Sequence, residues 1–350
     1  MRVLIATDAW HPQINGVVRT LTAVERATKA LGATFTFITP DQFPSVPLPG
    51  YPQIPLALPN PRTVARLVGE ARADVIHITT EGPVGHFVRR YCLANGLRFT
   101  TSLHTRLPDY VSARAPIPEA WTWAWMRRFH NAGAGVMAST PAFAAELAGR
   151  GFRNTMLWPR GVDTELFRPR TGADLGLDRP VFLSVGRLAV EKNIEAFLSL
   201  KLPGSKLVVG DGPARAELAT RFPEVHFLGA LEGEALARVY SAADVFVFPS
   251  RTDTFGLVLL EALASGLPVA AFPVAGPRDV ISGVPVGVLS SDLRAAALDA
   301  LRVSRDACRA FAVRHSWRES ARSFLGNVAA AHAAHPVSVT SQAEHSSFAA

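Results

Sequence analysis

Residues 249–269 read PSRTDTFGLVLLEALASGLPV, and this stretch decides the interpretation of the whole chain. The apolar run just before it, Val245–Phe248, is typical of a buried parallel strand. A polar turn follows, and apolar side chains from Leu257 up to Gly266 are typical of a helix that ends at the glycine. A strand, a turn and a helix in this order indicate a parallel α/β sheet.

Two carboxylates, Asp253 and Glu261, lie eight residues apart in this stretch. Eight helical residues advance about 12 Å and turn about 80° beyond two full turns, so both acids can face one cleft. The first backbone N–H groups of the helix have no helical partner and attract phosphate. These groups belong to Thr254, Phe255, Gly256 and Leu257. An ordinary turn with an Asp cap and a solvated Glu is the alternative.

The same alternation of strands and helices extends in both directions along the chain. The expected strands are Val3–Ala6, Thr34–Thr39, Val75–Ile78, Arg98–Leu103, Ala134–Ala138, Thr155–Trp158, Val181–Val185, Lys206–Val209, Val225–Gly229, Val245–Phe248, Pro268–Phe272 and Val286–Leu289. We therefore predict an α/β fold with two Rossmann-like parallel-sheet domains that face a cleft.

Three segments depart from the alternation. Pro40–Pro61 contains eight prolines, which predicts an extended loop without regular structure. Arg305–Ala331 is predicted to be one long helix, and the polar residues 332–350 a disordered tail.

Composition narrows the function classes. The chain has 350 residues, 48% of them hydrophobic, and a net charge of +7, which suits an anionic partner. No stretch approaches 18 uninterrupted apolar residues, and the N-terminus runs directly into a strand, so we expect neither a membrane span nor a signal peptide. The two cysteines, Cys92 and Cys308, are predicted to be small core residues in a reduced, cytoplasmic protein.

The spacing of Asp253 and Glu261 around FGLVLLEA resembles the signature of retaining nucleotide-sugar glycosyltransferases of family 4, which have the GT-B fold. The family usually has Glu where this chain has Asp253, so the departure bears on the donor sugar. The resemblance implies that Glu261 binds ribose hydroxyls and that Asp253 binds hydroxyls of the donor sugar. Within the family the chain is similar to GDP-mannose-dependent α-mannosyltransferases and to diacylglycerol glycosyltransferases.

The resemblance extends to residues that follow other strands. Gly186, Arg187 and Lys192, after the strand Val181–Val185, match the family's diphosphate clamp, against the alternative of ordinary surface cations. His104 matches a histidine that reaches the transferred sugar, with a capping role as the alternative. Gly16 lies in a loop that covers the diphosphate or admits the acceptor, unless it is a simple turn glycine. The implied domains are 1–163 on the acceptor side and 164–304 on the donor side, with 305–331 packing back on the first.

The expected activity is transfer of a hexose, with retention of configuration, from a nucleotide diphosphate sugar to a lipid or glycan hydroxyl. A UDP-sugar-dependent diacylglycerol glycosyltransferase and a sugar-nucleotide epimerase are alternatives within the fold. A basic protein that binds nucleotide sugar or nucleic acid is the alternative outside enzymes, but no nucleic-acid-binding module is visible. There is no Asp-x-Asp motif, and cations occupy the phosphate position, so we expect no cofactor and no obligatory metal.

The segment 117–131 contains three tryptophans. Trp121 and Trp125 share one helical face near Arg127 and Arg128, with Arg114 just before the segment. Tryptophan beside arginine is typical of a helix that lies on a membrane surface. The same pattern also fits a core helix with amphipathic edges, which the sequence favours. Peripheral contact with an anionic inner membrane face is therefore an open alternative.

Overall fold

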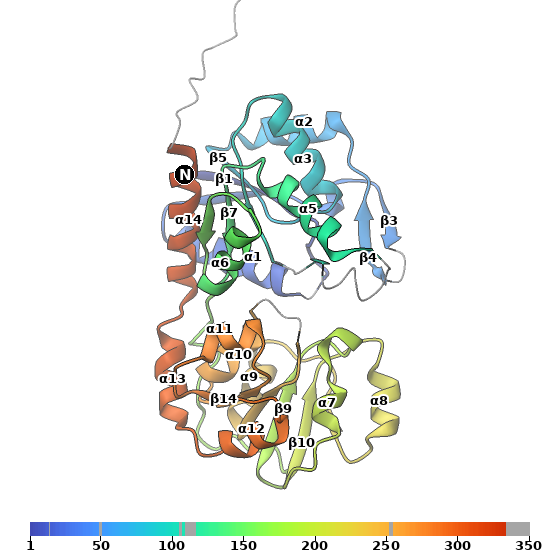
Figure 1. The fold of residues 1–350 in the computed structure, drawn as a ribbon, viewed down its shortest axis with the longest axis vertical. Coiled ribbons are helices and arrows are strands. Elements are labelled where there is room, and N and C mark those ends of the chain that lie inside the picture. The colour runs from blue at the N-terminus through green and yellow to red at the C-terminus, as the bar shows by residue number, and fades with distance from the viewer. Residues whose placement is uncertain (14, 49–50, 105–106, 109–116, 252–254, 334–350) are drawn as a thin grey trace, which may run out of the picture.

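A computed structural model describes residues 1–13, 15–48, 51–104, 107–108, 117–251 and 255–333. It has two α/β halves, one above the other in Figure 1, each built on a six-stranded sheet whose pairings are all parallel. In the described part of the chain, no helix is both long and apolar enough to cross a bilayer.

The first sheet has the strand order β2-β1-β5-β6-β7-β8. Its strands are β1 (Arg2–Ala6), β2 (Thr34–Ile38), β5 (Val75–Ile78), β6 (Thr100–Ser102), β7 (Gly135–Ala138) and β8 (Thr155–Leu157). Helices α1 (Gly16–Lys29), α2 (Pro61–Ala71), α3 (Pro83–Ala94), α5 (Glu119–His130), α6 (Pro141–Gly149) and α14 (Trp317–Ala333) surround it. Because helices cover both faces, the central strands β1 and β5 are mostly apolar and are buried at every position except Arg2.

The second sheet has the order β11-β10-β9-β12-β13-β14. Its strands are β9 (Val181–Val185), β10 (Ser205–Val209), β11 (His226–Phe227), β12 (Val245–Phe248), β13 (Val269–Ala271) and β14 (Gly287–Leu289). The helices around it are α7 (Glu195–Leu198), α8 (Arg215–Arg221), α9 (Gly233–Ala242), α10 (Leu257–Ala264), α11 (Ala275–Ile281), α12 (Leu293–Ala300) and α13 (Arg305–Val313). Along β12, Val245 and Val247 pack into one core cluster and Phe246 and Phe248 into another, as expected of a strand buried on both faces.

The prediction that Pro40–Pro61 is an irregular loop was wrong. This segment forms a short 3₁₀ helix, η1 (Pro40–Gln42), and an antiparallel pair of strands, β3 (Ser45–Leu48) and β4 (Tyr51–Ala57). Each strand of a two-stranded ribbon has one edge without a hydrogen-bonded neighbour. Proline has no backbone N–H to donate, and at such an edge no donor is required.

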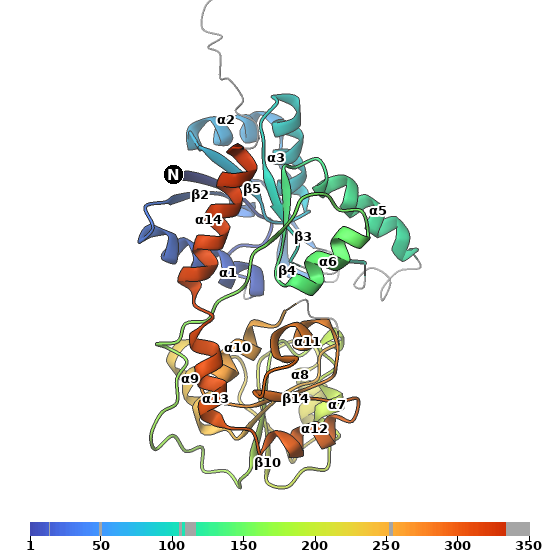
Figure 2. The same cartoon turned by 60° about the vertical axis from the view of Figure 1, so that its left-hand side comes forward.

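The prediction of one helix over Arg305–Ala331 was also wrong, because the helix breaks between α13 and α14. At the break, Val162 N donates a hydrogen bond to His315 O (2.9 Å). The linker and the C-terminal segment run in parallel at this point, as they pass from one half to the other. A Cβ on Gly161 would lie 2.5 Å from Trp317 N, so only glycine allows this approach. Helix α14 then packs against α1 of the first half (Figures 1 and 2).

Both cysteines are buried free thiols, which confirms their prediction as core residues. His77, which lies in the buried strand β5, is fully buried, and its ring nitrogens are hydrogen-bonded to Thr100 and Ser102. The tryptophans of α5 divide: Trp123 is buried, whereas Trp121 is 71% exposed and Trp125 is 40% exposed. The favoured core interpretation therefore fails for Trp121, because its side of α5 does not face the sheet.

Candidate active site

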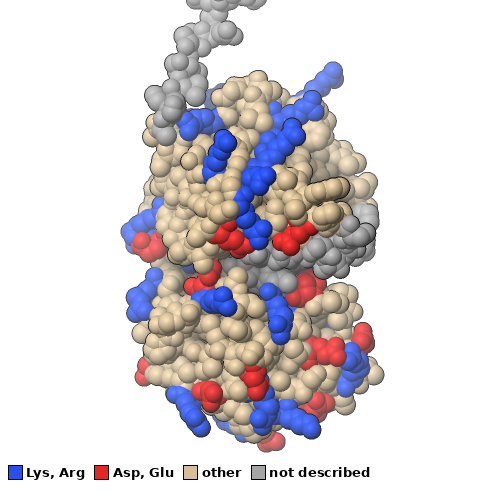
Figure 3. Space-filling model, viewed as in Figure 1, with Lys and Arg blue, Asp and Glu red and all other residues tan. Residues whose placement is uncertain are grey.

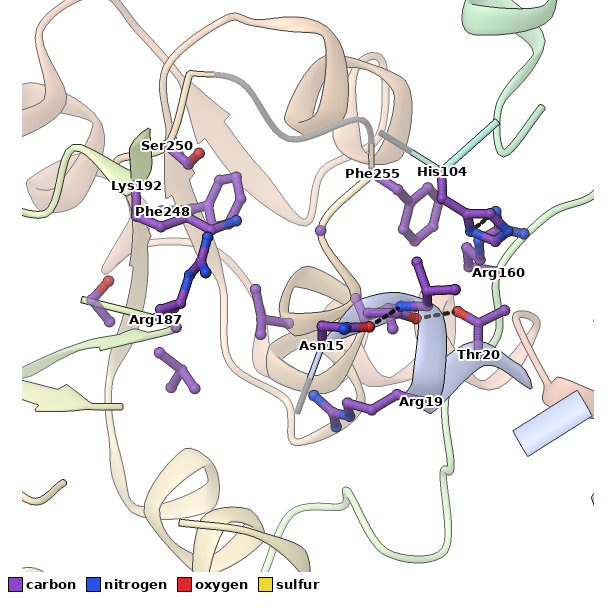
Figure 4. A pocket seen from close by; sticks show the side chains of 18 of the residues that line it. Asn15, Arg19, Thr20, His104, Arg160, Arg187, Lys192, Phe248, Ser250 and Phe255 are labelled. Carbon is purple, nitrogen blue, oxygen red and sulfur yellow. Dashed lines mark hydrogen bonds between the residues drawn. The ribbon is translucent and has the colours of Figure 1, made fainter. Parts of the chain in front are cut away.

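A cavity of about 510 Å³ lies between the two halves, where the strand order of each sheet reverses direction. In the first sheet this point is between β1 and β5, and in the second between β9 and β12. Open α/β sheets bind ligands beyond the carboxyl ends of the strands at such a point. Residues that follow β1, β9 and β12 line the cavity, and so do His104 and Arg160 (Figure 4).

Two cations line the wall formed by the second half. Arg187 and Lys192, both predicted for the diphosphate, lie with Gly186 in the segment after β9. Arg187 forms an ion pair with Glu191, and Asn193 Nδ2 donates to Pro249 O (3.0 Å), which ties this segment to the end of β12. The two predicted cations therefore lie after the carboxyl end of β9, in a segment that is bonded to the end of the adjacent strand β12.

Ser250 belongs to the same wall and was not singled out from the sequence. Ser250 is 2% exposed, and its side chain lines the cavity near Lys192 (Figure 4). The hydroxyl oxygen has no hydrogen-bond partner among the described residues. Because buried hydroxyl groups are almost always hydrogen-bonded, this oxygen indicates a place for a ligand or a water molecule.

The N-terminus of α10 opens into the cavity, as the sequence predicted. Phe255, Gly256 and Leu257 line it, and Gly256 has a φ of +83°. A Cβ at Gly256 would lie 3.1 Å from Phe248 Cζ, so both the backbone angle and the space favour glycine. Asp253 and Thr254, predicted for the donor sugar and the phosphate, lie outside the described residues.

Glu261 is buried in α10 and faces a neighbouring cavity of about 730 Å³ rather than the first one. The Tyr240 hydroxyl donates to its carboxylate (3.1 Å), and Arg19 of α1 forms an ion pair with it from across the interdomain boundary. Burial raises the pKa of Glu261, while Arg19 and Tyr240 oppose that rise. Arg19 and Leu257 line both cavities, so they separate Glu261 from the two cations.

The wall formed by the first half begins with α1. Asn15 caps this helix by accepting hydrogen bonds from Val17 N and Val18 N, both 3.0 Å long. Gly16 lies at the start of the helix and lines the cavity, as predicted. A Cβ built on Gly16 would lie 4.0 Å from Leu257 Cδ1, so the N-termini of α1 and α10 approach each other across the cleft.

His104 lines the cavity beside Phe255 (Figure 4). Arg160 Nη2 donates to its Nδ1 (3.2 Å), and because a guanidinium group can only donate, Nδ1 must accept. The ring proton is therefore on Nε2, which lies 2.8 Å from Ser102 Oγ, and Ser102 Oγ is 3.1 Å from His77 Nε2. Burial, followed by the charge of Arg160, holds the pKa of His104 well below its usual value, so the ring is neutral.

The structure thus brings eight of the predicted residues around one interdomain space, with Glu261 behind Arg19: Gly16, His104, Gly186, Arg187, Lys192, Phe255, Gly256 and Leu257. Sequence reasoning missed Arg19, Arg160, Tyr240 and Ser250. No local motif signals the first three, since their partners are distant in the sequence. Ser250 had a signal, because it directly follows the buried strand β12 at the ligand-binding end of the sheet.

Comparisons with known proteins show the family of the chain. Residues 14–166 match the profile described as Glycosyltransferase Family 4, and residues 179–306 match the one described as Glycosyl transferases group 1. The chain is 31% identical over 316 residues to a GDP-mannose-dependent alpha-mannosyltransferase of Mycobacterium tuberculosis, with 83% of each chain covered. It is 33% identical over 259 residues to sulfoquinovosyl transferase SQD2 of Arabidopsis thaliana, covering 68% of this chain and 50% of the relative.

Among solved structures, the sucrose-phosphate synthase of Thermosynechococcus elongatus has a TM-score of 0.76 at 22% identity, covering 95% of this chain and 100% of the other. Anabaena HepE, in complex with UDP and glucose, has a TM-score of 0.70 at 17% identity, covering 93% and 99%. These two likenesses support the GT-B fold.

Proposed function

The chain belongs to glycosyltransferase family 4 and is a nucleotide-sugar hexosyltransferase; we propose that it transfers mannose from GDP-mannose, with retention, to a hydroxyl group of a lipid or glycan. The choice of donor rests on three relatives named as GDP-mannose-dependent alpha-mannosyltransferases, which are 30–32% identical over 83% of this chain. The choice of acceptor class rests on these relatives and on an alpha-monoglucosyldiacylglycerol synthase that is 28% identical over 87% of the chain.

The observation that carries the chemistry is the wall with Arg187, Lys192 and the unpartnered hydroxyl of Ser250. When the glycosyl bond breaks, negative charge develops on the departing diphosphate. Fixed cations, a hydroxyl donor and the free N–H groups of α10 stabilise such charge more in the transition state than in the ground state. This wall is therefore the proposed diphosphate site.

The ribose is proposed to bind Glu261. Arg19 forms an ion pair with this carboxylate, so ribose hydroxyls must either displace Arg19 or bind beside it. The bound donor would then extend past Arg19, from the cavity with the two cations into the cavity that Glu261 faces. Asp253 is proposed to bind hydroxyls of the mannose.

Retention follows if the acceptor attacks on the face from which the diphosphate leaves. The bond between the anomeric carbon and the phosphate oxygen breaks, the bond to the acceptor oxygen forms, and the acceptor proton passes to the departing phosphate. His104 is neutral, and each of its ring nitrogens contacts a protein group, which suits a positioning role better than that of a general base.

The reaction is proposed to need no metal, because Arg187 and Lys192 supply positive charge at the diphosphate.

We also propose that α5 contacts an anionic membrane surface. Trp121 and Trp125 are exposed, as are Arg127 and Arg128 in the last turn of the helix. Figure 3 shows basic side chains gathered in a band over the first half, whereas the second half mixes both signs. Basic residues near such a surface contribute about 1 kcal/mol each, and inserted tryptophans add a salt-resistant part.

A donor panel tests the reaction. The protein is incubated with GDP-mannose, GDP-glucose, UDP-glucose and UDP-glucuronate and a membrane lipid extract, and the nucleotide diphosphate released is measured. GDP released from GDP-mannose, together with a labelled lipid or glycan, is expected. Release only from UDP-sugars would exclude the proposed donor, and an altered nucleotide sugar without an acceptor would indicate an epimerase.

Co-sedimentation with anionic vesicles tests the membrane contact. Binding should be weak, reduced by high salt without being abolished, and diminished in Trp121→Ala/Trp125→Ala at an unchanged melting temperature. Val313→Ala, an exposed apolar side chain on α13, is the matched control. Wild-type protein that remains in the supernatant would exclude this attachment.

A further inference from the structure

Arg160 has an unusual environment for a charged residue. It follows β8 at the start of the linker between the two halves, its side chain is 5% exposed, and it lines the cavity beside His104 (Figure 4). Its guanidinium group lies over the ring of Trp158, with Cζ 4.4 Å from the ring centroid. Nη1 donates to Trp158 O (3.0 Å) and Nη2 donates to His104 Nδ1 (3.2 Å).

None of these three partners carries a negative charge. They are a carbonyl oxygen, an aromatic face and a neutral imidazole. Across the described ranges, no carboxylate lies within ion-pair distance of Arg160. The other two arginines of this cavity differ, because Arg19 is paired with Glu261 and Arg187 with Glu191.

Burying a cation without a counterion is costly, by several kcal/mol even after the protein relaxes. Burial accordingly lowers the pKa of Arg160 to about 9. Such a group is expected where a ligand supplies the missing negative charge. A guanidinium group has five N–H donors, and the two bonds above use two of them, so donors remain for an oxyanion.

We propose that Arg160, held in place by His104 and Trp158, forms an oxyanion subsite on the wall contributed by the first half of the chain. This inference rests on the proposed function of the cavity. The subsite takes a phosphate, sulfonate or carboxylate group of a substrate. Mannose is uncharged, so the anion comes either from the donor diphosphate or from an acidic group of the acceptor. Because Arg187 and Lys192 already serve the diphosphate on the opposite wall, an acidic acceptor has the greater need of Arg160.

The first test needs no turnover and measures thermal unfolding of the full chain with and without inorganic sulfate at constant ionic strength. Arg160→Gln should melt at the same or a higher temperature than the wild type without sulfate, because an unneutralised buried charge is removed. It should lose part of the sulfate-dependent stabilisation, and the part that remains is expected from Arg187 and Lys192. Arg302→Gln, which removes an exposed positive charge elsewhere, should keep that stabilisation.

The second test separates the two sources of the anion by isothermal titration calorimetry. It measures the affinity of the protein for GDP and then, at saturating GDP, its affinities for D-glucuronate and for neutral methyl glucoside. A charged hydrogen bond of this kind corresponds to roughly tenfold to hundredfold in affinity. Loss of glucuronate binding in Arg160→Gln with unchanged GDP binding assigns the subsite to the acceptor, and weakened GDP binding assigns it to the donor. Arg160→Lys keeps the positive charge but loses the planar guanidinium group, so it should retain part of the affinity for the anion.

Sulfate stabilisation and ligand affinities that are equal in the wild type and Arg160→Gln would overturn the proposal. So would a melting temperature that falls in both Arg160 variants and is not restored by any anion, because Arg160 would then be structural. Neither result depends on the identity of the donor, so failure of this subsite is distinguishable from failure of the proposed mannosyl transfer.

Discussion

Replacing Arg19 by alanine should destabilise the protein, and the loss should grow as the pH rises. Arg19 and Glu261 form an ion pair between α1 and α10, with side-chain exposures of 39% and 5%. Because Arg19 is more than a third exposed, solvent screens the pair, and we expect a loss of about 1–2 kcal/mol. With about 2.1 cal/mol/K of unfolding entropy per residue, that corresponds to a melting temperature lower by about 1–3 °C for this 350-residue chain.

The pH dependence follows from the carboxyl group of Glu261. Burial raises its pKa in the folded protein, and Arg19 opposes this rise, so Arg19→Ala should raise the pKa further. A carboxyl group with a raised folded-state pKa contributes its stability below the unfolded value and loses it as the pH rises through the folded value. At pH 5 the variant should therefore melt closer to the wild type than at pH 8.

Differential scanning calorimetry of four proteins measures this effect: the wild type, Arg19→Ala, Glu261→Gln and the double variant. In the Glu261→Gln background, Arg19→Ala should cost less and should show no added pH dependence. Equal losses at pH 5 and pH 8, with and without the carboxylate, would mean that the pair contributes nothing and that Arg19 acts through packing alone.

Three further outcomes are expected from the active site. Lys192→Ala should lower kcat by about a hundredfold at saturating donor with an unchanged fold, because a contact that stabilises transition-state charge contributes roughly 3 kcal/mol. A near-normal rate would show that Lys192 does not stabilise the departing diphosphate. Activity should survive EDTA, and a loss that Mg²⁺ or Mn²⁺ restores would show that the protein cations do not suffice. Asp253→Glu, which restores the acid usual in the family, should shift the preference among donor sugars if Asp253 contacts the sugar, and an unchanged donor profile would place it elsewhere.

Local patterns in the sequence were sufficient for the sheets and for much of the site. Buried strands such as Val181–Val185 and Val245–Phe248 are short apolar runs, and the polar segments after them must lie at the carboxyl edge of a parallel sheet. That rule predicts that Arg187, Lys192 and Gly256 lie at the ligand-binding edge, and all three line the cavity. The assignments of roles to these residues, and the domain boundaries, remain predictions.

The same patterns failed where a segment depends on a distant partner. The prolines of 40–61 exclude a central strand, but they do not exclude a two-stranded ribbon with open edges. The residues from Arg305 to Ala331 have helical character throughout, yet the helix breaks where His315 meets the linker at Val162. Helical periodicity places Trp121 and Trp125 on one face, but only the packing of α5 leaves Trp121 exposed and buries Trp123.

Only the tertiary structure decided which charges meet across the cleft. Arg19 and Glu261 are 242 residues apart, and Arg160 and His104 are 56 residues apart. Each contact depends on how two separately folded sheets and the linker between them are positioned, and no local pattern in the sequence specifies that position. The sequence alone therefore determined two α/β halves with polar segments at the carboxyl edges of their sheets, because the alternation of apolar strands and polar turns is a local pattern. The pairing of Glu261 with Arg19 and the unneutralised charge of Arg160 came from the packing of the halves, because electrostatic contacts depend on distance in space.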